Sequence, residues 1–262
     1  MACSACRPQR RVPVDFSKKE PAQPSLVAGA GVLRLAIGAM LGPQETFESY
    51  ERLMRYVAER AGRRAEVVQR RTYEETNRLL LDGEIDVAFI CTGAYVTIRD
   101  RVRLLAVPVV AGSPTYASVV LARRGGPASI DALRGLRFAF TDPLSNTGRL
   151  YPIYLLKRRF VATPREFFGS IVYSGAHDES IRLVLDGVVD AAAVDSLVWE
   201  KFAARRPAPA AELAVIHRSP AFGAPPFVAN LALDPALAET VRAVLFGMAE
   251  DVEGAAILSG LG

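Results

Sequence analysis

The sequence predicts an α/β protein made of two similar lobes, and three observations point to this fold class. From about Val32 onward, short β-like runs alternate with amphipathic helical stretches, the pattern of a mainly parallel sheet covered by helices. The segments 78–88 and 182–192, one in each half of the chain, repeat the order of a helix end, a glycine and an apolar strand. Two further stretches cross between the halves, and a double crossing favours a hinge that closes around a ligand.

Composition places the chain among globular proteins. Its 262 residues are 50% hydrophobic and 23% charged, with three cysteines, which excludes a disordered chain and a disulfide-stapled mini-protein. No apolar run reaches the roughly 18 to 20 residues that a membrane helix needs. The net charge of +4 is compatible with an anionic small ligand, a nucleic acid or an arginine-rich solvated surface.

The elements of the first half follow from local signals. Thr72 and Glu75 form a capping box, which predicts a helix that ends at Gly83. Residues 1–30 are rich in Pro, Ser, Arg and Lys without a hydrophobic period, which indicates a flexible leader. Before the capping box, the predicted elements are a strand over 32–40, a helix over 46–61 and a strand over 65–69.

The chain is predicted to cross from one lobe to the other twice. The runs 104–110 and 116–122 carry it into the second lobe, and the runs 213–217 and 227–233 carry it back. The predicted division is therefore residues 31–112 and 226–262 for lobe 1 and residues 113–225 for lobe 2. Each lobe offers strand ends to a shared cleft, where open α/β sheets bind ligands.

A strand predicted over 136–140 runs into Thr141-Asp142-Pro143-Leu144-Ser145-Asn146-Thr147-Gly148 and then a helical stretch over 149–159. Ser, Asn and Thr are favoured N-caps, and capping is one interpretation of them, although three such side chains in a row exceed what one cap requires. A helix start also presents free N–H groups and a positive dipole end, so these side chains and the Gly148 amide are equally suited to an oxyanion.

Two more polar positions follow strands of the second half. His177 lies in Ser174-Gly175-Ala176-His177-Asp178-Glu179-Ser180, where a strand meets a helix, and it is either a capping residue or a ligand donor. Asp195 ends an apolar strand over 191–194, where it either caps the next helix or accepts hydrogen bonds from a ligand.

These segments resemble the phosphate, phosphite and phosphonate substrate-binding proteins of ABC transporters. The resemblance rests on 141–148, on 174–180 with its histidine, on Val189-Asp190-Ala191-Ala192-Ala193-Val194-Asp195-Ser196, and on the first-lobe stretch 86–96, and it extends from about Val32 to the C-terminus. It implies a type II periplasmic binding protein fold: two lobes, each a mixed sheet flanked by helices, joined by a two-strand hinge. The ligand is then expected between the lobes.

The resemblance also implies a set of ligand contacts and no catalytic residue, metal or cofactor. Ser145, Asn146, Thr147 and Gly148 would hold the phospho-group from the second lobe, with His177 as a charge-assisted donor. Asp195 would face the remaining side of the ligand. The first lobe would close over it with the residues Tyr95, Thr92, Cys91, Gln44 and Thr46.

Parts of the sequence also fit other functions. Cys91, His177 and Asp195 can be written as a nucleophile, a base and an orienting group, but two histidines in the chain are a thin supply of general bases, so no enzyme is predicted. The arginine pairs are scattered and mostly end helices or strands, so nucleic acid is not predicted as a partner. Cys91 leaves open a binding protein that senses arsenite for a histidine kinase.

The partners and location follow from the resemblance. A membrane permease of an ABC transporter, or else a sensor kinase, would receive the loaded protein, which is expected to be a monomer. The periplasm is the expected compartment. Cys3 and Cys6, followed by a proline-rich segment, look like the start of a mature lipoprotein whose signal lies upstream, and which cysteine carries the lipid stays open.

Overall fold

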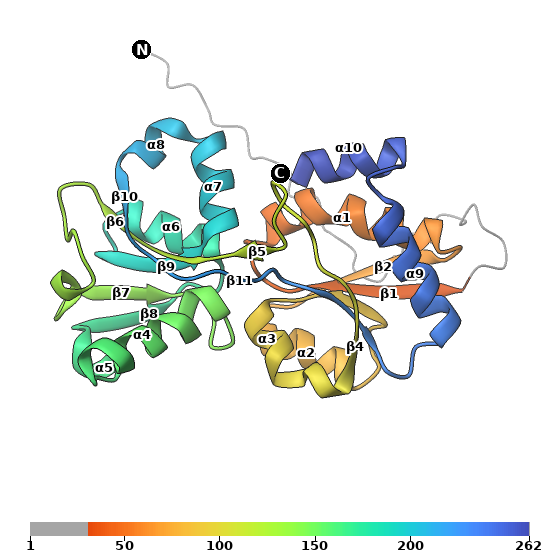
Figure 1. The fold of residues 1–262 in the computed structure, drawn as a ribbon, viewed down its shortest axis with the longest axis horizontal. Helices are drawn as coiled ribbons and strands as arrows, with labels where there is room; N and C mark the ends of the chain where they lie inside the picture. The colour runs from red at the N-terminus through yellow and green to blue at the C-terminus, as the bar shows by residue number, and fades with distance from the viewer. Residues whose placement is uncertain (1–30, 262) are drawn as a thin grey trace, which may run out of the picture.

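The computed structural model describes residues 31–261, except for the side chains of residues 43–49, and it consists of two lobes side by side (Figure 1). The predicted leader, with Cys3 and Cys6, lies outside the described residues. Each lobe has its own five-stranded sheet, and the two sheets are built from different parts of the chain.

The sheet of the first lobe has the strand order β2-β1-β3-β12-β4. Strand β1 is parallel to β2 and β3, whereas β12 is antiparallel to β3 and β4, so the sheet is mixed. Its strands are β1 (Val32–Ile37), β2 (Arg64–Gln69), β3 (Val87–Phe89), β4 (Val102–Ala106) and β12 (Phe227–Asn230). One face packs against α1 (Pro43–Arg60), α9 (Pro235–Gly247) and α10 (Val252–Leu261), the other against α2 (Tyr73–Leu81) and α3 (Thr92–Ile98).

The sheet of the second lobe has the order β10-β6-β9-β7-β8 and is also mixed. Its strands are β6 (Ser118–Arg123), β7 (Arg137–Phe140), β8 (Ser170–Tyr173), β9 (Ala191–Asp195) and β10 (Leu213–Arg218). The helices on its two faces are α4 (Tyr151–Phe160) and α5 (Pro164–Phe167) on one, and α6 (His177–Leu185) and α7 (Ser196–Arg205) on the other, with α8 (Pro207–Ala211) following α7. A single π-helical turn, η3 (Asn146–Leu150), leads directly into α4.

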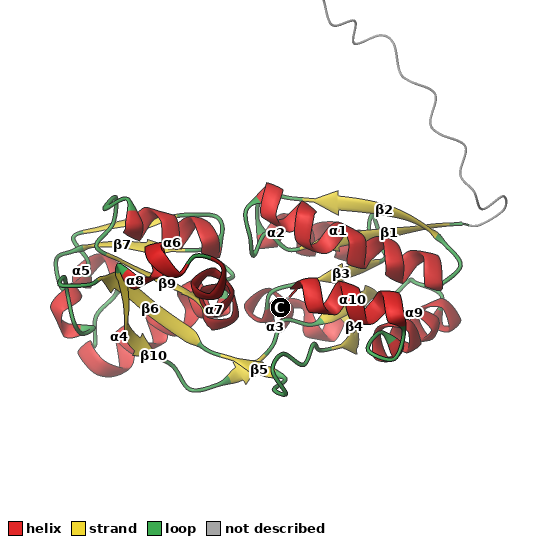
Figure 2. Ribbon diagram, turned by 90° about the horizontal axis from the view of Figure 1, so that it is seen from above, coloured by secondary structure: helices red, strands yellow, loops and turns green. Residues whose placement is uncertain are grey.

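The two lobes are joined by two short strands, β5 (Thr115–Tyr116) and β11 (Phe222–Gly223), which pair antiparallel. Figure 1 labels both strands, and Figure 2 shows β5 between the lobes from above. The chain passes from β4 through β5 into β6, and it returns from β10 through β11 to β12. The chain therefore crosses twice between the lobes, as expected from the sequence, through the segments 107–117 and 219–226, which contain these two strands.

The internal repeat has a structural counterpart in both lobes. Asp86 accepts hydrogen bonds from the backbone N–H, Nε and Nη2 of Arg34, at 2.8, 3.1 and 2.6 Å. Asp190 accepts the same three bonds from Arg137, at 2.8, 3.1 and 2.7 Å. In each copy the aspartate therefore ties a helix–turn–strand unit to the neighbouring strand of the sheet, β1 in the first lobe and β7 in the second. The capping box at Thr72 is also confirmed.

Candidate functional site

The turn before η3 is built from its own polar side chains. Ser145 is fully buried, and its Oγ accepts a hydrogen bond of 3.0 Å from the Gly148 N–H. Ser118 Oγ donates to the Thr147 carbonyl at 2.6 Å, which holds the turn against β6. The Gly148 amide, expected to face a ligand, is thus used within the cap. The same position needs glycine because a Cβ there would lie 2.2 Å from Thr141 Oγ1.

Thr147 differs from its neighbours in this turn. Its side chain is completely buried, and its Oγ1 has no hydrogen-bond partner in the described part of the chain. Buried hydroxyl groups in folded proteins are nearly always paired. Thr147 therefore keeps an uncommitted donor at the start of the continuous helical segment 146–160.

His177 is buried at the start of α6 and is neutral. Its Nδ1 accepts a bond of 3.2 Å from the backbone N–H of Asp195 and lies 3.1 Å from Thr141 Oγ1. This arrangement assigns the proton to Nε2, which is a neutral N–H donor. Burial lowers the pKa of His177 to about 3. The neutral Nε2–H can still make a charge-assisted hydrogen bond to an anionic ligand, so the role expected for this side chain stays a prediction.

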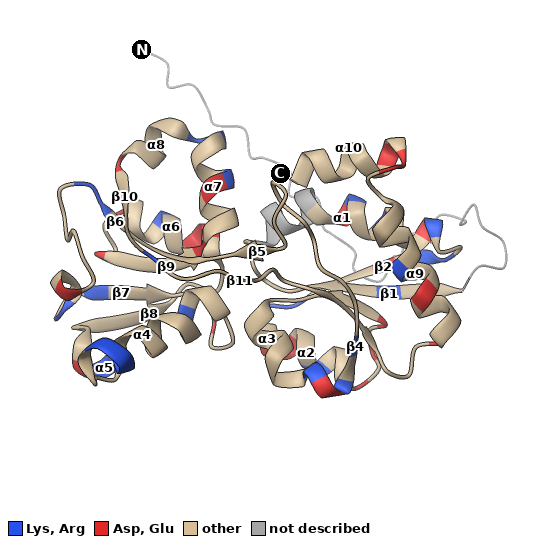
Figure 3. Cartoon of the chain, viewed as in Figure 1, with Lys and Arg blue, Asp and Glu red and all other residues tan. Residues whose placement is uncertain are grey.

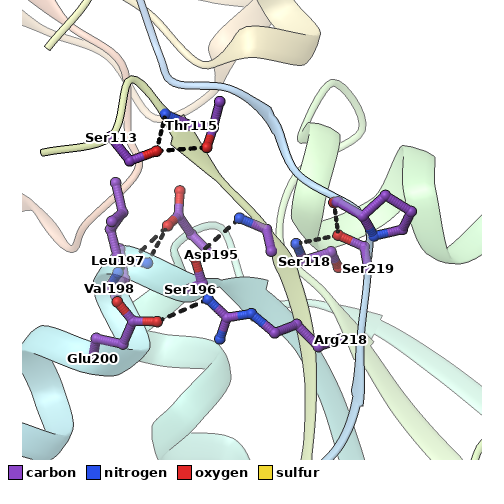
Figure 4. A network of polar contacts seen from close by, with 12 residues as sticks. Ser113, Thr115, Ser118, Asp195, Ser196, Leu197, Val198, Glu200, Arg218 and Ser219 are labelled. Atoms are coloured by element: carbon purple, nitrogen blue, oxygen red, sulfur yellow. Dashed lines mark hydrogen bonds and ion pairs between the residues drawn. The ribbon is translucent and has the colours of Figure 1, made fainter. Parts of the chain in front are cut away.

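Asp195 ends β9 and caps α7. Its Oδ1 accepts bonds from the N–H groups of Leu197, at 2.7 Å, and Val198, at 3.4 Å. The second carboxylate oxygen has no bond to the residues drawn in Figure 4. Burial raises the pKa of Asp195 to about 7, in spite of these two bonds, and the charge of Glu200 adds to the effect. Capping of α7 and contact with a ligand are therefore compatible roles for Asp195. One carboxylate oxygen caps the helix, and the other is not needed for capping.

The first lobe presents Cys91 and α3 to this group. Burial raises the pKa of Cys91 to about 11, although backbone N–H groups of Asn146, Gly93 and Ala94 donate hydrogen bonds to its sulfur. A protonated thiol is a poor nucleophile and a poor ligand for arsenic, so this environment adds no support to either role. One of those three donors, Asn146, belongs to the other lobe, so Cys91 lies at the interface.

Thr92 and Tyr95 are held inside the first lobe and the hinge. Thr92 Oγ1 donates to the carbonyl of Gly223 in β11 at 2.8 Å. The ring of Tyr95 packs against the core cluster under α2 and α3. Their contact with a ligand stays a prediction. Gln44 and Thr46 lie in the first turns of α1, where the side chains are not described.

The lobes touch through backbone groups around the same residues. Asp142 Oδ2 accepts from the Tyr73 N–H at 3.2 Å, and Asp178 Oδ1 accepts from the Gly42 N–H at 2.9 Å. The His177 N–H donates to the Met40 carbonyl at 3.0 Å. The structure therefore shows a closed arrangement, in which the polar turns of the second lobe meet the loops of the first.

Sequence reasoning missed Tyr73, Tyr116 and Asp142 as interface residues. Asn146 Nδ2 donates to Tyr116 Oη in the hinge at 3.2 Å. Asp142 belongs to the segment 141–148, which the sequence indicates as a site, but its partner Tyr73 lies 69 positions away in the sequence. No local sequence pattern indicates that the start of α2 faces the second lobe. Tyr73 is therefore not predicted from the sequence as an interface residue.

The interface residues described above include no lysine or arginine: Cys91, Tyr73, Tyr116, Asp142, Ser145, Asn146, Thr147, His177 and Asp195. The charged residues shown in Figure 3 are spread over helices, loops and strands of both lobes, with basic and acidic residues interspersed. A hollow of about 700 Å³ lies elsewhere, on the second lobe between β8 and α5, and shares no residue with the interface group. An anion between the lobes would therefore be held by neutral donors, as helix starts and hydroxyl groups allow.

Comparison with known proteins decides the family. Residues 35–262 match the family model described as "ABC transporter, phosphonate, periplasmic substrate-binding protein". The chain belongs to this family. The type II periplasmic binding fold follows from that membership and from the solved relatives below, and the family itself is one of substrate-binding proteins. Within residues 31–261, no helix has both the length and the apolar character needed to cross a membrane.

Two similar proteins are named for the import or binding of phosphorus compounds. The phosphate-import protein PhnD of Mycolicibacterium smegmatis is 27% identical over 208 residues, which cover 74% of this chain and 64% of that protein, slightly less than two thirds of it. A probable phosphite-binding protein PhnD1 of Prochlorococcus marinus is 42% identical over 69 residues, covering 26% of this chain and 23% of that protein.

Two solved structures have the same fold. A binding component of an ABC phosphonate transporter from Pseudomonas aeruginosa has a TM-score of 0.83 at 22% identity, covering 88% of this chain and 79% of that one. PhnD1 of Prochlorococcus marinus, in complex with methylphosphonate, has a TM-score of 0.78 at 19% identity, covering 87% of this chain and 89% of that one.

Proposed function

We propose that this family member is the solute-binding component of an ABC-type uptake system and that it takes a small phosphorus oxyanion: phosphate, phosphite or a phosphonate. Family membership and the names of the relatives support the ligand class. The structural observation that carries the proposal is the buried, uncommitted hydroxyl of Thr147 at a helix start between the lobes. A membrane permease is the proposed partner, with the protein acting as a periplasmic monomer.

The proposed binding mode uses neutral donors. Thr147 Oγ1 and the N–H on His177 Nε2 would donate to ligand oxygens, and the hydroxyl proton of Ser145 is free to do the same while its oxygen caps Gly148. Asp195 would share a proton with one ligand oxygen, either as the acid or as the carboxylate. Hydrogen bonds to a charged group are stronger than those between neutral groups. Several such bonds would therefore hold the oxyanion without a lysine or arginine side chain.

Isothermal titration tests the ligand class. The protein, unfolded and refolded to remove any ligand carried through purification, is titrated with phosphate, phosphite, methylphosphonate, aminoethylphosphonate and arsenite. Dissociation constants in the micromolar range or below for a phosphorus oxyanion are expected. Binding of arsenite alone, or of no compound in the series, would contradict the proposed ligand class.

Replacing Thr147 with valine, which preserves shape and removes the hydroxyl, is expected to weaken oxyanion binding by about 10- to 150-fold, the cost of one hydrogen bond to a charged group. The melting temperature without ligand should stay the same or rise, because the lost hydroxyl has no protein partner. Thr240→Val on the exposed face of α9 is the matched control. An affinity within twofold of the wild type would remove Thr147 from the site.

A further inference from the structure

The second lobe contains a hollow that the proposed oxyanion site does not use. Its volume is about 700 Å³, and it lies between β8, α4 and α5, which are neighbours in Figure 1. This is the face of the sheet opposite to α6 and α7. Pockets that hold small organic molecules have volumes of about 300 to 1,000 Å³. The hollow is therefore large enough for a ligand of its own.

Three aromatic residues line the hollow. Phe140 ends β7 and Tyr173 ends β8, with their ring centroids 5.9 Å apart, and the ring of Phe168 lies 6.1 Å from that of Phe140. Phe140 and Phe168 are buried in the core of the lobe, whereas 50% of Tyr173 is exposed. The buried rings thus fix one wall, and the exposed ring leaves a surface on which a flat apolar molecule can pack.

Two arginines line the same hollow, and neither forms an ion pair within residues 31–261. Arg149 is held in place, because its Nε donates to Tyr173 Oη at 2.7 Å and its Nη1 donates to the Pro143 carbonyl at 2.9 Å. Arg165 is exposed and has no hydrogen bond or ring contact in the described part of the chain. Its neighbour Glu166 is occupied in capping α5, where it accepts from the backbone at 2.7 Å.

The charge of the hollow is therefore unbalanced. Among the described residues that line it, two are basic and none is acidic. Strand β8 is also the last strand of its sheet and pairs only with β7, so its outer edge leaves backbone groups without a strand partner in the described residues. An apolar wall beside a few polar and charged groups is the usual composition of a small-molecule site.

We propose that this hollow is a second binding site, separate from the one between the lobes, for a small organic anion with a flat aromatic body. The aromatic body packs on Tyr173, and a carboxylate, sulfonate or phosphate-ester group pairs with Arg149 and Arg165. An inorganic oxyanion meets only the second requirement, because it has no surface to cover the exposed ring. The inference does not depend on the proposed function.

Two fluorescent probes test the two halves of the proposal. Anilinonaphthalene sulfonate is an aromatic sulfonate whose emission rises in apolar surroundings, and N-phenylnaphthylamine has the same rings without the charge. The sulfonate is expected to bind the wild-type protein at one saturable site. The neutral probe should bind about tenfold more weakly or worse, since it loses the hydrogen bonds between a charged group and the arginines.

Arg165→Gln locates the probe. This variant is expected to bind the sulfonate about fivefold more weakly, between the small effect of an exposed ion pair and the larger one of a hydrogen bond to a charged group. Arg158→Gln is the matched control, because Arg158 is exposed on α4 outside the hollow and the same charge is removed. It should keep wild-type affinity.

Three results would overturn the inference. The first is the absence of saturable binding of the sulfonate by the wild type. The second is equal affinity of the wild type for the charged and the neutral probe. The third is an affinity for the sulfonate that is unchanged in Arg165→Gln, or reduced equally in Arg165→Gln and Arg158→Gln, because the probe would then lie elsewhere or respond only to net charge.

Discussion

Gly93→Ala is expected to block closure of the two lobes and to weaken oxyanion binding by about 100-fold or more, the equivalent of losing two hydrogen bonds to a charged group. A Cβ at Gly93 would lie 2.1 Å from the Leu144 carbonyl oxygen and 2.8 Å from the Asn146 nitrogen. Both are backbone atoms of the other lobe, so no side-chain rotation relieves the overlap. Alanine suits a helix, so α3 and each lobe should fold as before.

Two measurements check this prediction. Titration should show the loss of affinity, and small-angle scattering should show a larger radius of gyration that no longer shrinks when ligand is added. Gly247→Ala in α9 is the control, because a Cβ there meets no atom within 4 Å. Binding by Gly93→Ala within threefold of the wild type would mean that the contact between Gly93 and Leu144 is not part of the ligand-bound state.

Oxyanion affinity is expected to be highest below about pH 7 and to fall about tenfold per pH unit at higher pH, once the ligand is also fully ionised. The reason is one proton shared between Asp195, whose pKa is about 7, and a ligand oxygen. Above both pKa values that proton must be taken from solution. His177, with a pKa of about 3, and Cys91, with one of about 11, do not titrate between pH 5 and 9.

Asp195→Asn isolates this effect. Asparagine also caps helices and keeps an N–H donor for the ligand, so binding should become nearly independent of pH above 7. The folded pKa of Asp195 is raised above its ordinary value of 3.8, so its contribution to stability is complete below about pH 4 and is lost as pH rises through 7. The variant should therefore raise the unliganded melting temperature more at pH 8 than at pH 5.

Titrations from pH 5.5 to 9 in buffers of equal ionic strength, together with melting curves, provide the measurement. A wild-type affinity that stays constant from pH 6 to 9 would show that no proton is shared at Asp195. An Asp195→Asn variant with the same slope as the wild type would assign the slope to the ligand alone.

Local signals in the sequence determined the architecture of this protein. The repeat at 78–88 and 182–192 and the capping box at Thr72 depend on contacts within a few turns of the chain, so periodicity and glycine positions suffice to predict them. The second-lobe turn with Ser145 and Thr147 was found in the same way, because hydroxyl residues at a helix start form a local pattern.

Only the tertiary structure decided what each polar group does. Gly148 gives its N–H to Ser145 and His177 is neutral, because burial and hydrogen-bond geometry set the donors and the charge. Tyr73, Asp142 and Gly93 became interface residues when two lobes from distant parts of the chain came together. Sequence spacing records contacts along a helix or strand, whereas contacts between the lobes depend on how the hinge brings two separate surfaces together.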